Sequence, residues 1–444
     1  MIKAYELKVG SHRGNKRVWI ESQKILKTDL AENMSFSPIY DIESKKIVLE
    51  AGDTHRITMR KTSKRGIIDI NNSKISEIFG DTHAIVVKIF KDKIEISPSK
   101  EDIEQLRAEK KSNNNTPTFI EVFAGGGTLV KSLNDAGLKP VAAIELEDKY
   151  LENTEANNPE LFTYCGDLSR LDLSLLPDAD IVSGGIPCEG FSKSQLAKSR
   201  KESHPTGSLG YFFLKVVDYI RPSVVLIEEV PDFGNSSMGA MARYVLRSMG
   251  YHISETELVG TEKGSLAKRK RYCMVASIKK PFEFKKDKLN SNKKIIDILE
   301  IPLKERVWLT KENSKTIAYS LKKEKEHIKK GDGFRIGRTR IDDVFAVTIT
   351  KGYYKNRLTD PILVHPENEN MYSWFTPREL ARINGLPEDF ILPGGKRDKT
   401  KSGEIIGQGI CYESFYSLGL DIKKHFLSTT DEDKNLFDFV EEVA

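Results

Sequence analysis

The fold of this chain is best predicted from the stretch Val182-Ser183-Gly184-Gly185-Ile186-Pro187-Cys188-Glu189-Gly190-Phe191-Ser192. An apolar run, 179–182, precedes two glycines, a proline and a single cysteine. The run predicts a short buried strand, and the glycines permit a sharp turn at its carboxyl end. Because Pro187 fixes its own φ, Cys188 is expected at the edge of a sheet, where open α/β sheets carry their chemistry. A buried structural cysteine in a tight turn is the alternative, and this stretch alone leaves both interpretations open.

The bulk composition is that of a globular protein with two or three domains. The chain has 444 residues, of which 39% are hydrophobic and 30% are charged. It shows neither a signal peptide nor an apolar span of about 18 residues, so we expect a cytoplasmic protein without a membrane partner. Four cysteines without CxxC pairs argue against a disulfide framework and against a zinc site, and we predict no bound metal. The net charge is +5 and its basic residues are clustered, which suits a polyanionic partner, although solvated surface also explains each cluster.

Residues 1–110 are predicted to form an N-terminal β-rich module. Short alternating runs are separated by turn residues, and Lys91-Asp92-Lys93 is typical of a hairpin tip. The predicted strands are Arg17–Ile20, Lys46–Leu49, His55–Met59, Ile67–Ile70, Ala84–Phe90 and Lys93–Ile96. The module faintly resembles small β-barrel or swapped-hairpin DNA-binding modules but carries no motif. DNA binding, dimerisation and plain packing therefore all remain open, and the polar linker 111–117 marks a domain boundary.

After the linker, strand and helix patterns alternate, which predicts a mostly parallel sheet over residues 118–280. The expected strands are Thr118–Phe123, Val141–Glu145, Phe162–Tyr164, Ala179–Ser183, Ser223–Ile227 and Arg271–Ile278, and the expected helices include Leu129–Ala136 and Phe212–Ile220. Residues 281–370 are rich in lysine and low in large apolar residues, so we expect them to pack on a neighbour or to face a ligand. Helical patterns resume at Thr376–Leu386 and Tyr412–Leu420, in the C-terminal part 371–444.

A glycine-rich loop, Phe123-Ala124-Gly125-Gly126-Gly127-Thr128, follows the first of these strands and opens a helix. Its glycines let a cofactor approach the backbone, and Glu145, at the end of the next strand, can accept both ribose hydroxyls. The loop departs from GxGxxG because Leu129 and Val130 occupy the third-glycine region. A dinucleotide needs that loop for its pyrophosphate, so the pattern favours S-adenosyl-L-methionine, which has no phosphate. Asp167 ends the third strand at a height suited to an adenine amino group, although an Asp in a turn is common.

Two carboxylates, Glu228 and Glu229, end the buried strand that begins at Ser223. Burial would keep such a carboxyl able to donate a proton, and strand alternation lets only one of the two face a pocket. A helix N-cap acid is the alternative. Arg269 and Arg271 stand two apart at the start of the next strand and are expected to share a face. Such a pair suits an anionic group, or else forms a solvated basic edge.

Taken together, residues 118–425 resemble the cytosine-C5 DNA methyltransferases. Six blocks follow that family's order: the FxGxG-like loop Phe123–Gly127, the Pro-Cys loop Gly185–Ser192, Glu228-Glu229-Val230 for Glu-Asn-Val, Lys268–Arg271 for Gln-x-Arg-x-Arg, the Arg-Glu-x-x-Arg block in Phe375–Pro387, and Gly407–Ile410 for Gly-Asn-x-Val. The departures are Glu229, Ala267, Gln408, Thr128 and Glu189. None of them removes the cysteine or the first glutamate.

The resemblance implies an α/β, Rossmann-like fold that uses S-adenosyl-L-methionine, and a DNA (cytosine-5-)-methyltransferase acting on a flipped-out cytosine in a specific duplex sequence. Cys188 would add to carbon 6, Glu228 would hold N3, and Arg271, with Arg269, would hold the O2 side or the adjacent backbone. The cofactor-binding residues that it implies are Phe123, Gly125, Gly127, Thr128, Leu129, Glu145, Asp167, Leu168, Pro187 and Gln408.

The resemblance also divides the chain into functional parts. Residues 118–280 would be the catalytic and cofactor-binding core, with a lid at 193–205. Residues 281–370 would be the target-recognition region, and residues 371–444 would complete the core. The expected partners are double-stranded DNA, a cognate restriction endonuclease unless the enzyme is an orphan, and a second copy if residues 1–110 dimerise.

Two other functions remain open at the level of sequence. One is an RNA cytosine-C5 methyltransferase, although the Cys-Phe-Thr triplet of the tRNA-acting branch does not occur in the sequence. The other is a DNA-binding regulator that kept the fold and lost most of its catalysis, which the departures from the family pattern motivate.

Overall fold

The structure, a computed structural model, describes residues 1–42, 44–60, 62, 65–80, 82–99, 116–187, 208–285, 288–289, 292–331, 333–355, 359–394 and 398–443, with side chains as far as Ser428. The chain forms two compact units, Met1–Arg107 and Ala108–Ala444. Cys188 and Glu189, with the rest of the loop after Pro187, lie outside the described residues, and so does the expected lid 193–205.

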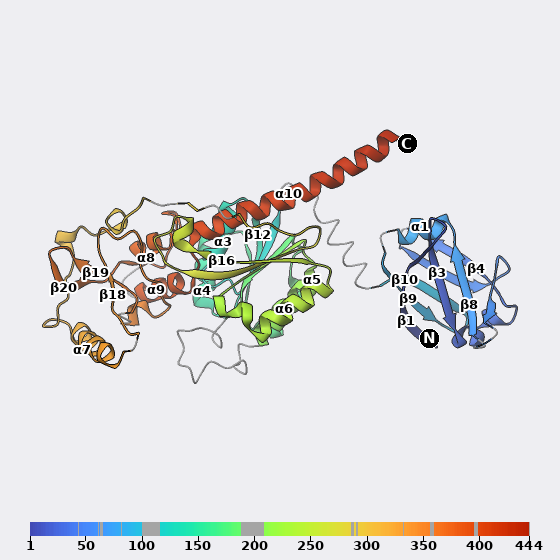
Figure 1. Ribbon diagram of the computed structural model, residues 1–444, viewed down its shortest axis with the longest axis horizontal. Coiled ribbons are helices and arrows are strands. Elements are labelled where there is room, and N and C mark those ends of the chain that lie inside the picture. The colour runs from blue at the N-terminus through green and yellow to red at the C-terminus, as the bar shows by residue number, and fades with distance from the viewer. Residues whose placement is uncertain are drawn as a thin grey trace. The chain divides into compact units, whose positions relative to one another are not determined.

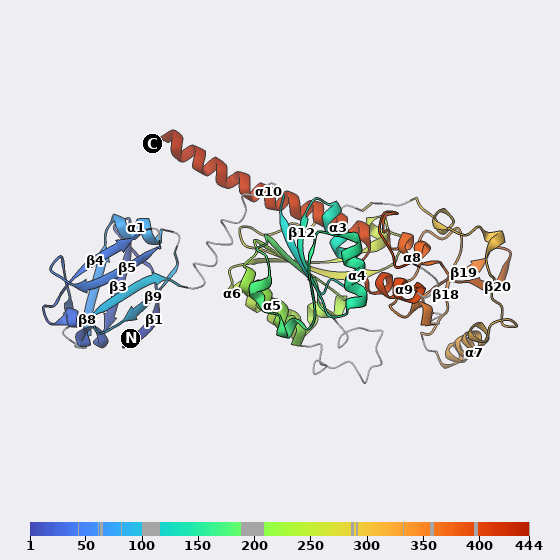
Figure 2. The same ribbon diagram turned by 180° about the vertical axis from the view of Figure 1, so that it is seen from behind.

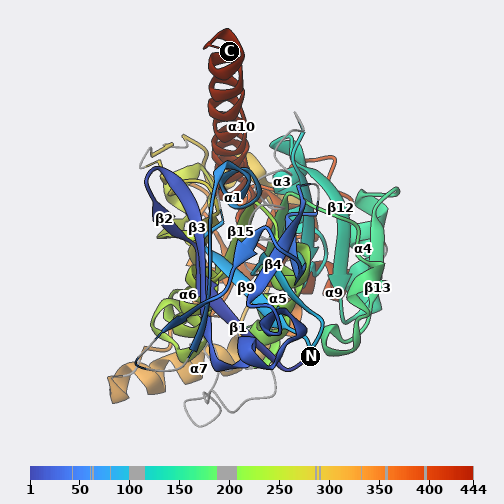
Figure 3. The same ribbon diagram turned by 90° about the vertical axis from the view of Figure 1, so that its right-hand side faces the viewer.

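The first unit contains two antiparallel sheets around one core (Figure 1). The six-stranded sheet has the order β1-β9-β10-β5-β4-β6, and the four-stranded sheet has the order β2-β3-β8-β7. The elements are β1 (Lys3–Lys8), β2 (Gly10–His12), β3 (Asn15–Ser22), β4 (Ser35–Asp41), β5 (Lys46–Ala51), β6 (His55–Arg56), β7 (Thr58–Arg60), β8 (Arg65–Asn71), α1 (Ser73–Phe79), β9 (Ala84–Ile89) and β10 (Lys93–Pro98). The short strand β2 pairs with the longer β3 in the smaller sheet (Figure 3).

The chain crosses between these sheets at two single residues. Val9 separates β1 from β2, and Ile57 separates β6 from β7, and in both cases the two strands belong to different sheets. The sequence predicted one strand over His55–Met59. The structure breaks it because Ile57 is buried in the shared core, and its N–H donates to the carbonyl of Met34 at 2.8 Å.

The second unit is built on a seven-stranded sheet with the order β13-β12-β11-β14-β15-β17-β16. Its strands are β11 (Thr118–Val122), β12 (Lys139–Glu145), β13 (Phe162–Cys165), β14 (Ile181–Gly185), β15 (Val224–Glu229), β16 (His252–Val259) and β17 (Lys270–Ser277). The strands from β13 to β15 pair in parallel, whereas β17 pairs antiparallel with both β15 and β16. The predicted mostly parallel sheet is confirmed. Strand β16 was not predicted because it is an edge strand with two glutamates, Glu255 and Glu257, and no apolar run.

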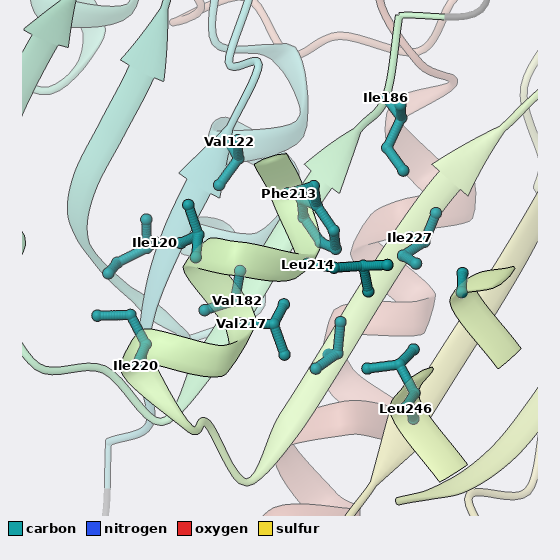
Figure 4. Close-up of a cluster of buried hydrophobic side chains, with 14 of the residues drawn as sticks. Ile120, Val122, Val182, Ile186, Phe213, Leu214, Val217, Ile220, Ile227 and Leu246 are labelled. Carbon is teal, nitrogen blue, oxygen red and sulfur yellow. The ribbon is translucent and has the colours of Figure 1, made fainter. Parts of the chain in front are cut away.

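Helices cover both faces of this sheet (Figures 1 and 2). On one face lie α5 (Leu209–Ile220) and α6 (Ser237–Ser248), whose apolar residues pack with those of β11, β14 and β15 (Figure 4). On the other lie α3 (Thr128–Asp135), α4 (Asp148–Asn157) and α10 (Tyr412–Val443). Here Phe415 and Leu418 of α10 pack with Leu133 of α3 and Leu226 of β15, so the C-terminal helix is part of the core. Within the described part of the chain, no helix is long and apolar enough to cross a membrane.

After Phe282 and Phe284, which pack in the main core with residues of α10, the chain forms a smaller lobe of the second unit up to Ser373. It contains α7 (Lys315–Lys330) and the three-stranded sheet β18-β19-β20, formed by Gly337–Thr339, Pro361–His365 and Asn368–Ser373. Helix α7 was predicted as a polar run rather than a helix because part of its buried face is polar. Its residue Glu324 accepts hydrogen bonds from both terminal nitrogens of Arg338, at 2.8 and 2.7 Å.

A buried ion pair ties this lobe to helix α8 (Pro377–Ile383), which is followed in the chain by α9 (Lys399–Gln408). Arg306 contacts Glu379 of α8, and their side chains are 1% and 0% exposed. Glu379 also accepts backbone hydrogen bonds from Glu300 at 2.7 Å and from Thr376 at 2.9 Å. The acid of the Arg-Glu-x-x-Arg block therefore has a structural role.

Replacing Glu379 by alanine should destabilise the protein strongly, because it leaves the Arg306 guanidinium buried without its counter-ion. We expect the free energy of unfolding to fall by roughly 3–5 kcal/mol in urea-induced unfolding. The matched control is Glu369→Ala, which breaks an exposed pair with Arg340 and should leave the unfolding curve nearly unchanged. Equal effects of the two substitutions would contradict the structural role of Glu379.

Candidate active site

Most of the predicted site residues that the structure describes lie at or just after the carboxyl ends of β11, β12, β13, β14 and β15. Gln408 instead ends α9, and Arg271 lies near the start of β17. The glycine loop after β11 turns through three residues with positive φ, Phe123 at +64°, Gly125 at +54° and Gly127 at +83°. A Cβ on Gly126 would clash with Ile405 of α9, and one on Gly127 would lie 3.0 Å from Thr154 of α4. The loop therefore needs glycine because two helices press against its backbone.

Glu145, at the end of β12, is held by the same loop. Its carboxylate accepts hydrogen bonds from the backbone N–H groups of Gly125 at 2.8 Å, Leu146 at 2.9 Å and Glu147 at 3.0 Å. A carboxylate offers about four acceptor positions, so roughly one stays available. Glu145 can accept both ribose hydroxyls only if a hydroxyl shares an acceptor position with one of these backbone N–H groups or replaces that group as the donor.

Gln408, at the end of α9, points toward the glycine loop. Its Nε2 atom lies 3.3 Å from the position of a Cβ on Gly125. That atom is buried and has no hydrogen-bond partner among the described residues. A buried amide donor without an acceptor is costly, so the loop is suited to a ligand that brings an acceptor to Gln408. Together, Glu145 and Gln408 provide acceptor and donor groups that fit the hydroxyls and the acceptor atoms of S-adenosyl-L-methionine.

Asp167 begins a short 3-10 turn, Leu168–Arg170, directly after β13. Its Oδ1 accepts a hydrogen bond from the backbone N–H of Ser169 at 2.9 Å, and this bond lowers the pKa of the Asp167 carboxyl. Asp172 caps the following turn in the same way, through the N–H of Ser174 at 3.0 Å. Asp167 therefore does form the turn contact that the sequence left as an alternative, while Leu168 is buried in the core beside it.

Thr128 and Leu129 open α3 and are both buried, at 5% and 6% exposure. A Cβ on Gly409 would lie 2.7 Å from Thr128 Oγ1, and this oxygen accepts from the N–H of Ile410 at 3.4 Å. Two segments almost 300 residues apart thus meet behind the glycine loop. Thr128 packs against Gly409, which gives this departure from the family pattern a structural reason.

Glu228 and Arg271 form an ion pair at the end of the sheet. The distance from Arg271 Nε to Glu228 Oε1 is 2.5 Å, and the side chains are 16% and 12% exposed, respectively. Glu228 is in register with Gly185 of β14, and a Cβ on Gly185 would lie 3.0 Å from Glu228 Oε2. The glycine thus lets the carboxylate lie against the strand end that leads into Pro187. Cys188 itself lies outside the described residues.

Glu229 and Arg269 make contacts different from those of their neighbours. Glu229 is 2% exposed, and its Oε2 accepts from the N–H of Val230 at 2.6 Å. Arg269 is 4% exposed and donates to the carbonyl of Ile349 at 3.0 Å. Because β17 begins at Lys270, Arg269 precedes the strand, and strand alternation does not place it beside Arg271. Of the two arginines, Arg271 pairs with Glu228, whereas Arg269 ties the core to the smaller lobe.

Glu121 was not singled out from the sequence. It lies in β11, is 1% exposed and contacts the Ser183 hydroxyl of β14. Burial, together with the nearby charge of Glu228, raises its pKa to about 8 even though the Ser183 bond acts in the opposite direction. The signal that could have found it is a single acid inside an apolar strand that leads into a glycine loop.

Comparison with known proteins agrees with this geometry. The model of the C-5 cytosine-specific DNA methylase family matches residues 117–424. The Type II methyltransferase M.DsaV of Dactylococcopsis salina is 30% identical over 290 residues, covering 62% of this chain and 78% of that protein. The Type II methyltransferase M.HhaI of Haemophilus parahaemolyticus is 28% identical over 325 residues, covering 68% and 94%.

Among solved structures, the S. pombe Dnmt2 methyltransferase has the same fold, with a TM-score of 0.56 at 20% identity over 69% of this chain and 99% of that one. The family match covers most of the second unit and includes the glycine loop, Gly185, Glu228 and Arg271. It confirms the resemblance that the six sequence blocks indicated, and the chain belongs to the C-5 cytosine-specific DNA methylase family.

Proposed function

We propose that the protein transfers a methyl group from S-adenosyl-L-methionine to carbon 5 of a cytosine in a specific double-stranded DNA sequence. The observation that carries this proposal is the Glu228–Arg271 pair beside Gly185, on the strand that leads into Pro187 and Cys188. Membership of the family supports the reaction. The names of the Type II relatives support a place in a restriction-modification system, with a cognate endonuclease as partner.

The reaction needs a nucleophile because carbon 5 of cytosine is itself a poor one. The thiolate of Cys188 adds to carbon 6, and the ring becomes an enamine whose carbon 5 can accept a methyl group. Glu228 holds N3 and supplies or stabilises a proton there, which favours the addition. Arg271 keeps the Glu228 carboxylate in place and holds the O2 side of the ring. A base then removes the carbon-5 proton, and the thiolate leaves.

S-adenosyl-L-methionine supplies an electrophilic methyl group when it is bound. We assign its binding to the glycine loop, to Glu145 for the ribose and to Gln408 for an acceptor atom of the ligand. The buried Nε2 of Gln408 and the acceptor position left on Glu145 support this assignment. Asp167 would accept the adenine amino group, since a carboxylate that bonds Ser169 through one oxygen keeps acceptor capacity on the other.

A cytosine inside a duplex exposes neither face of its ring, so it must be flipped out at a cost of a few kcal/mol. We propose that residues 193–205 close over the flipped base and that residues 281–370 recognise the target sequence. One segment of the smaller lobe supports the second assignment. Val344 and Phe345 are 53% and 45% exposed, and Lys268 Nζ lies 5.1 Å from the centre of the Phe345 ring. The exposed apolar side chains thus lie next to Lys268, which shortly precedes Arg271 in the sequence. This combination suits contact with DNA.

For the first unit we propose additional DNA contacts through its four-stranded sheet. Trp19 is 38% exposed on this sheet, and the Arg17 guanidinium lies 4.4 Å from the centre of its ring. The side chains of Arg60 and Arg65 are about half exposed on the same sheet, at 53% and 51%. Removing residues 1–110 should weaken DNA binding and reduce its salt dependence. Unchanged affinity at every salt concentration would contradict DNA contacts by this unit.

The activity itself is tested by mapping 5-methylcytosine in DNA from cells that express the protein. We expect methylation at one short sequence, and its loss when Cys188 is replaced by serine. A protein that binds DNA but leaves no 5-methylcytosine at any sequence would be the regulator that the departures from the family pattern suggest. Methylation confined to RNA would instead favour the RNA methyltransferase.

The role of Asp167 is tested against Asp172, which caps an equivalent turn but lies farther from the end of β13. Asp167→Ala should weaken the binding of S-adenosyl-L-methionine roughly five- to tenfold, as expected for one lost hydrogen bond. Asp172→Ala should leave the dissociation constant unchanged. Isothermal titration calorimetry measures both, and equal behaviour of the two variants would show that Asp167 is only a turn residue.

A further inference from the structure

Glu121 lies below the catalytic end of the sheet, in contact with the strand that carries the nucleophile loop. It is in register with Ser183 of β14, and both side chains are buried, at 1% and 0% exposure. The Ser183 hydroxyl bonds Glu121 Oε2 and also lies 3.3 Å from the carbonyl of Ile120. Glu121 therefore holds the strand that continues through Gly185 toward Cys188.

Strand register places Glu121 and Glu228 on the same face of the sheet. Glu121 pairs with Ser183, and Gly185, two residues farther along β14, pairs with Glu228 of β15. Registered neighbours project to the same face, and every second residue returns to that face. The two carboxyl side chains are thus separated by one strand, and the residue of that strand opposite Glu228 is a glycine.

The charged surroundings of Glu121 are simple. Its register partner on the other side, Ala143 of β12, is apolar. The groups that act on its carboxyl are the Ser183 hydroxyl and the charge of Glu228, and Glu228 is itself paired with Arg271 and in register with Cys273 of β17. Because burial raises the pKa of Glu121 to about 8, the group is mostly protonated at neutral pH.

Burying an acid of this kind lowers the free energy of unfolding relative to a hydrophobic residue at the same position. Phe119, two residues earlier on the same face of β11, packs with Leu129 and Leu133 of α3, and an aliphatic side chain at position 121 would extend that core. An uncharged carboxyl with a single hydroxyl partner regains less than it loses on leaving water. The position therefore calls for a role beyond the stability of the sheet.

We propose that Glu121 is a positioning residue for Glu228, acting through the Ser183 hydroxyl of β14. This proposal rests on the proposed function. The Ser183 bond fixes the strand end on which Gly185 faces the Glu228 carboxylate. The uncharged state leaves Arg271 as the charged group that holds Glu228. A negative charge on Glu121 would repel the Glu228 carboxylate and weaken its pairing with Arg271.

The test uses four variants of the full chain, Glu121→Leu, Ser183→Ala, the double variant and Glu121→Gln, with steady-state methylation kinetics on the target duplex. Glu121→Leu and Ser183→Ala should each lower kcat roughly tenfold, because a misplaced catalytic group is costly, with both KM values within about twofold of the wild type. The double variant should be no slower than the slower single variant, because both substitutions remove the same hydrogen bond. Thermal unfolding of each variant shows whether it is folded.

The Glu121→Gln variant distinguishes the effect of the side chain's shape on kcat from the effect of its charge. Its carboxamide has nearly the same shape as the acid, can bond Ser183 and stays uncharged, so it should restore most of the activity lost in Glu121→Leu at pH 7. Wild-type Glu121 loses its proton as the pH rises through about 8, so wild-type kcat should decline there. The Gln variant has no such proton to lose and should keep its kcat to higher pH.

Three results would overturn the proposal. They are wild-type kcat in a folded Glu121→Leu variant, losses that multiply in the double variant, and a Gln variant as slow as the Leu variant at pH 7. Each of these leaves the proposed methyltransferase function standing, because the wild type is active in all three. A wild type without methylation activity on any DNA would overturn both the function and this proposal.

Discussion

The Glu228–Arg271 ion pair beside Gly185 is the interaction on which the rest of the site depends. Three neighbouring strands build it: β15 carries Glu228, the antiparallel β17 brings Arg271 back to the same edge, and β14 supplies a glycine where any larger residue would meet the carboxylate. A carboxylate in this position has lost much of its hydration, and the guanidinium compensates for that loss. The order of strands in the sheet therefore explains why residues from three separate segments make one site.

The cofactor side of the site is assembled across an even longer span of the sequence. The glycine loop follows β11, yet Ile405 of α9 lies against Gly126, and Gly409 packs on Thr128. A Cβ on Gly407 would clash with the carbonyl of Thr350 in the smaller lobe. Helix α10 then completes the core on the same face of the sheet. The C-terminal segment thus closes the site from behind, and Gln408 reaches the loop because glycines on either side of it permit close packing.

The sequence predicted the elements whose signals are local. Apolar runs located six of the seven strands of the large sheet in the second unit, and the loop residues marked the carboxyl ends where the site lies. Features that depend on tertiary contacts could not be predicted from the sequence. Helix α7 buries Glu324 against Arg338, so polar residues interrupt the apolar face that Ile317 and Leu321 present to the lobe. Arg269 could not be told apart from Arg271, because the first residue of β17 decides which partner each arginine meets. The role of Glu121 depends on which strand lies next to β11, and no local pattern contains that information.

The central claim is that the Cys188 thiolate attacks a cytosine held by Glu228 and Arg271. The most direct measurement uses a duplex that contains the target sequence with 5-fluorocytosine at the methylated position, incubated with the protein and S-adenosyl-L-methionine. Because fluorine cannot leave as a proton does, the adduct cannot resolve, and a complex stable in denaturing gels should accumulate with the wild type. It should be absent with Cys188→Ala and much slower to form with Glu228→Gln. A stable complex that persists without the Cys188 sulfur, or its absence from a wild type that binds this duplex, would contradict the account.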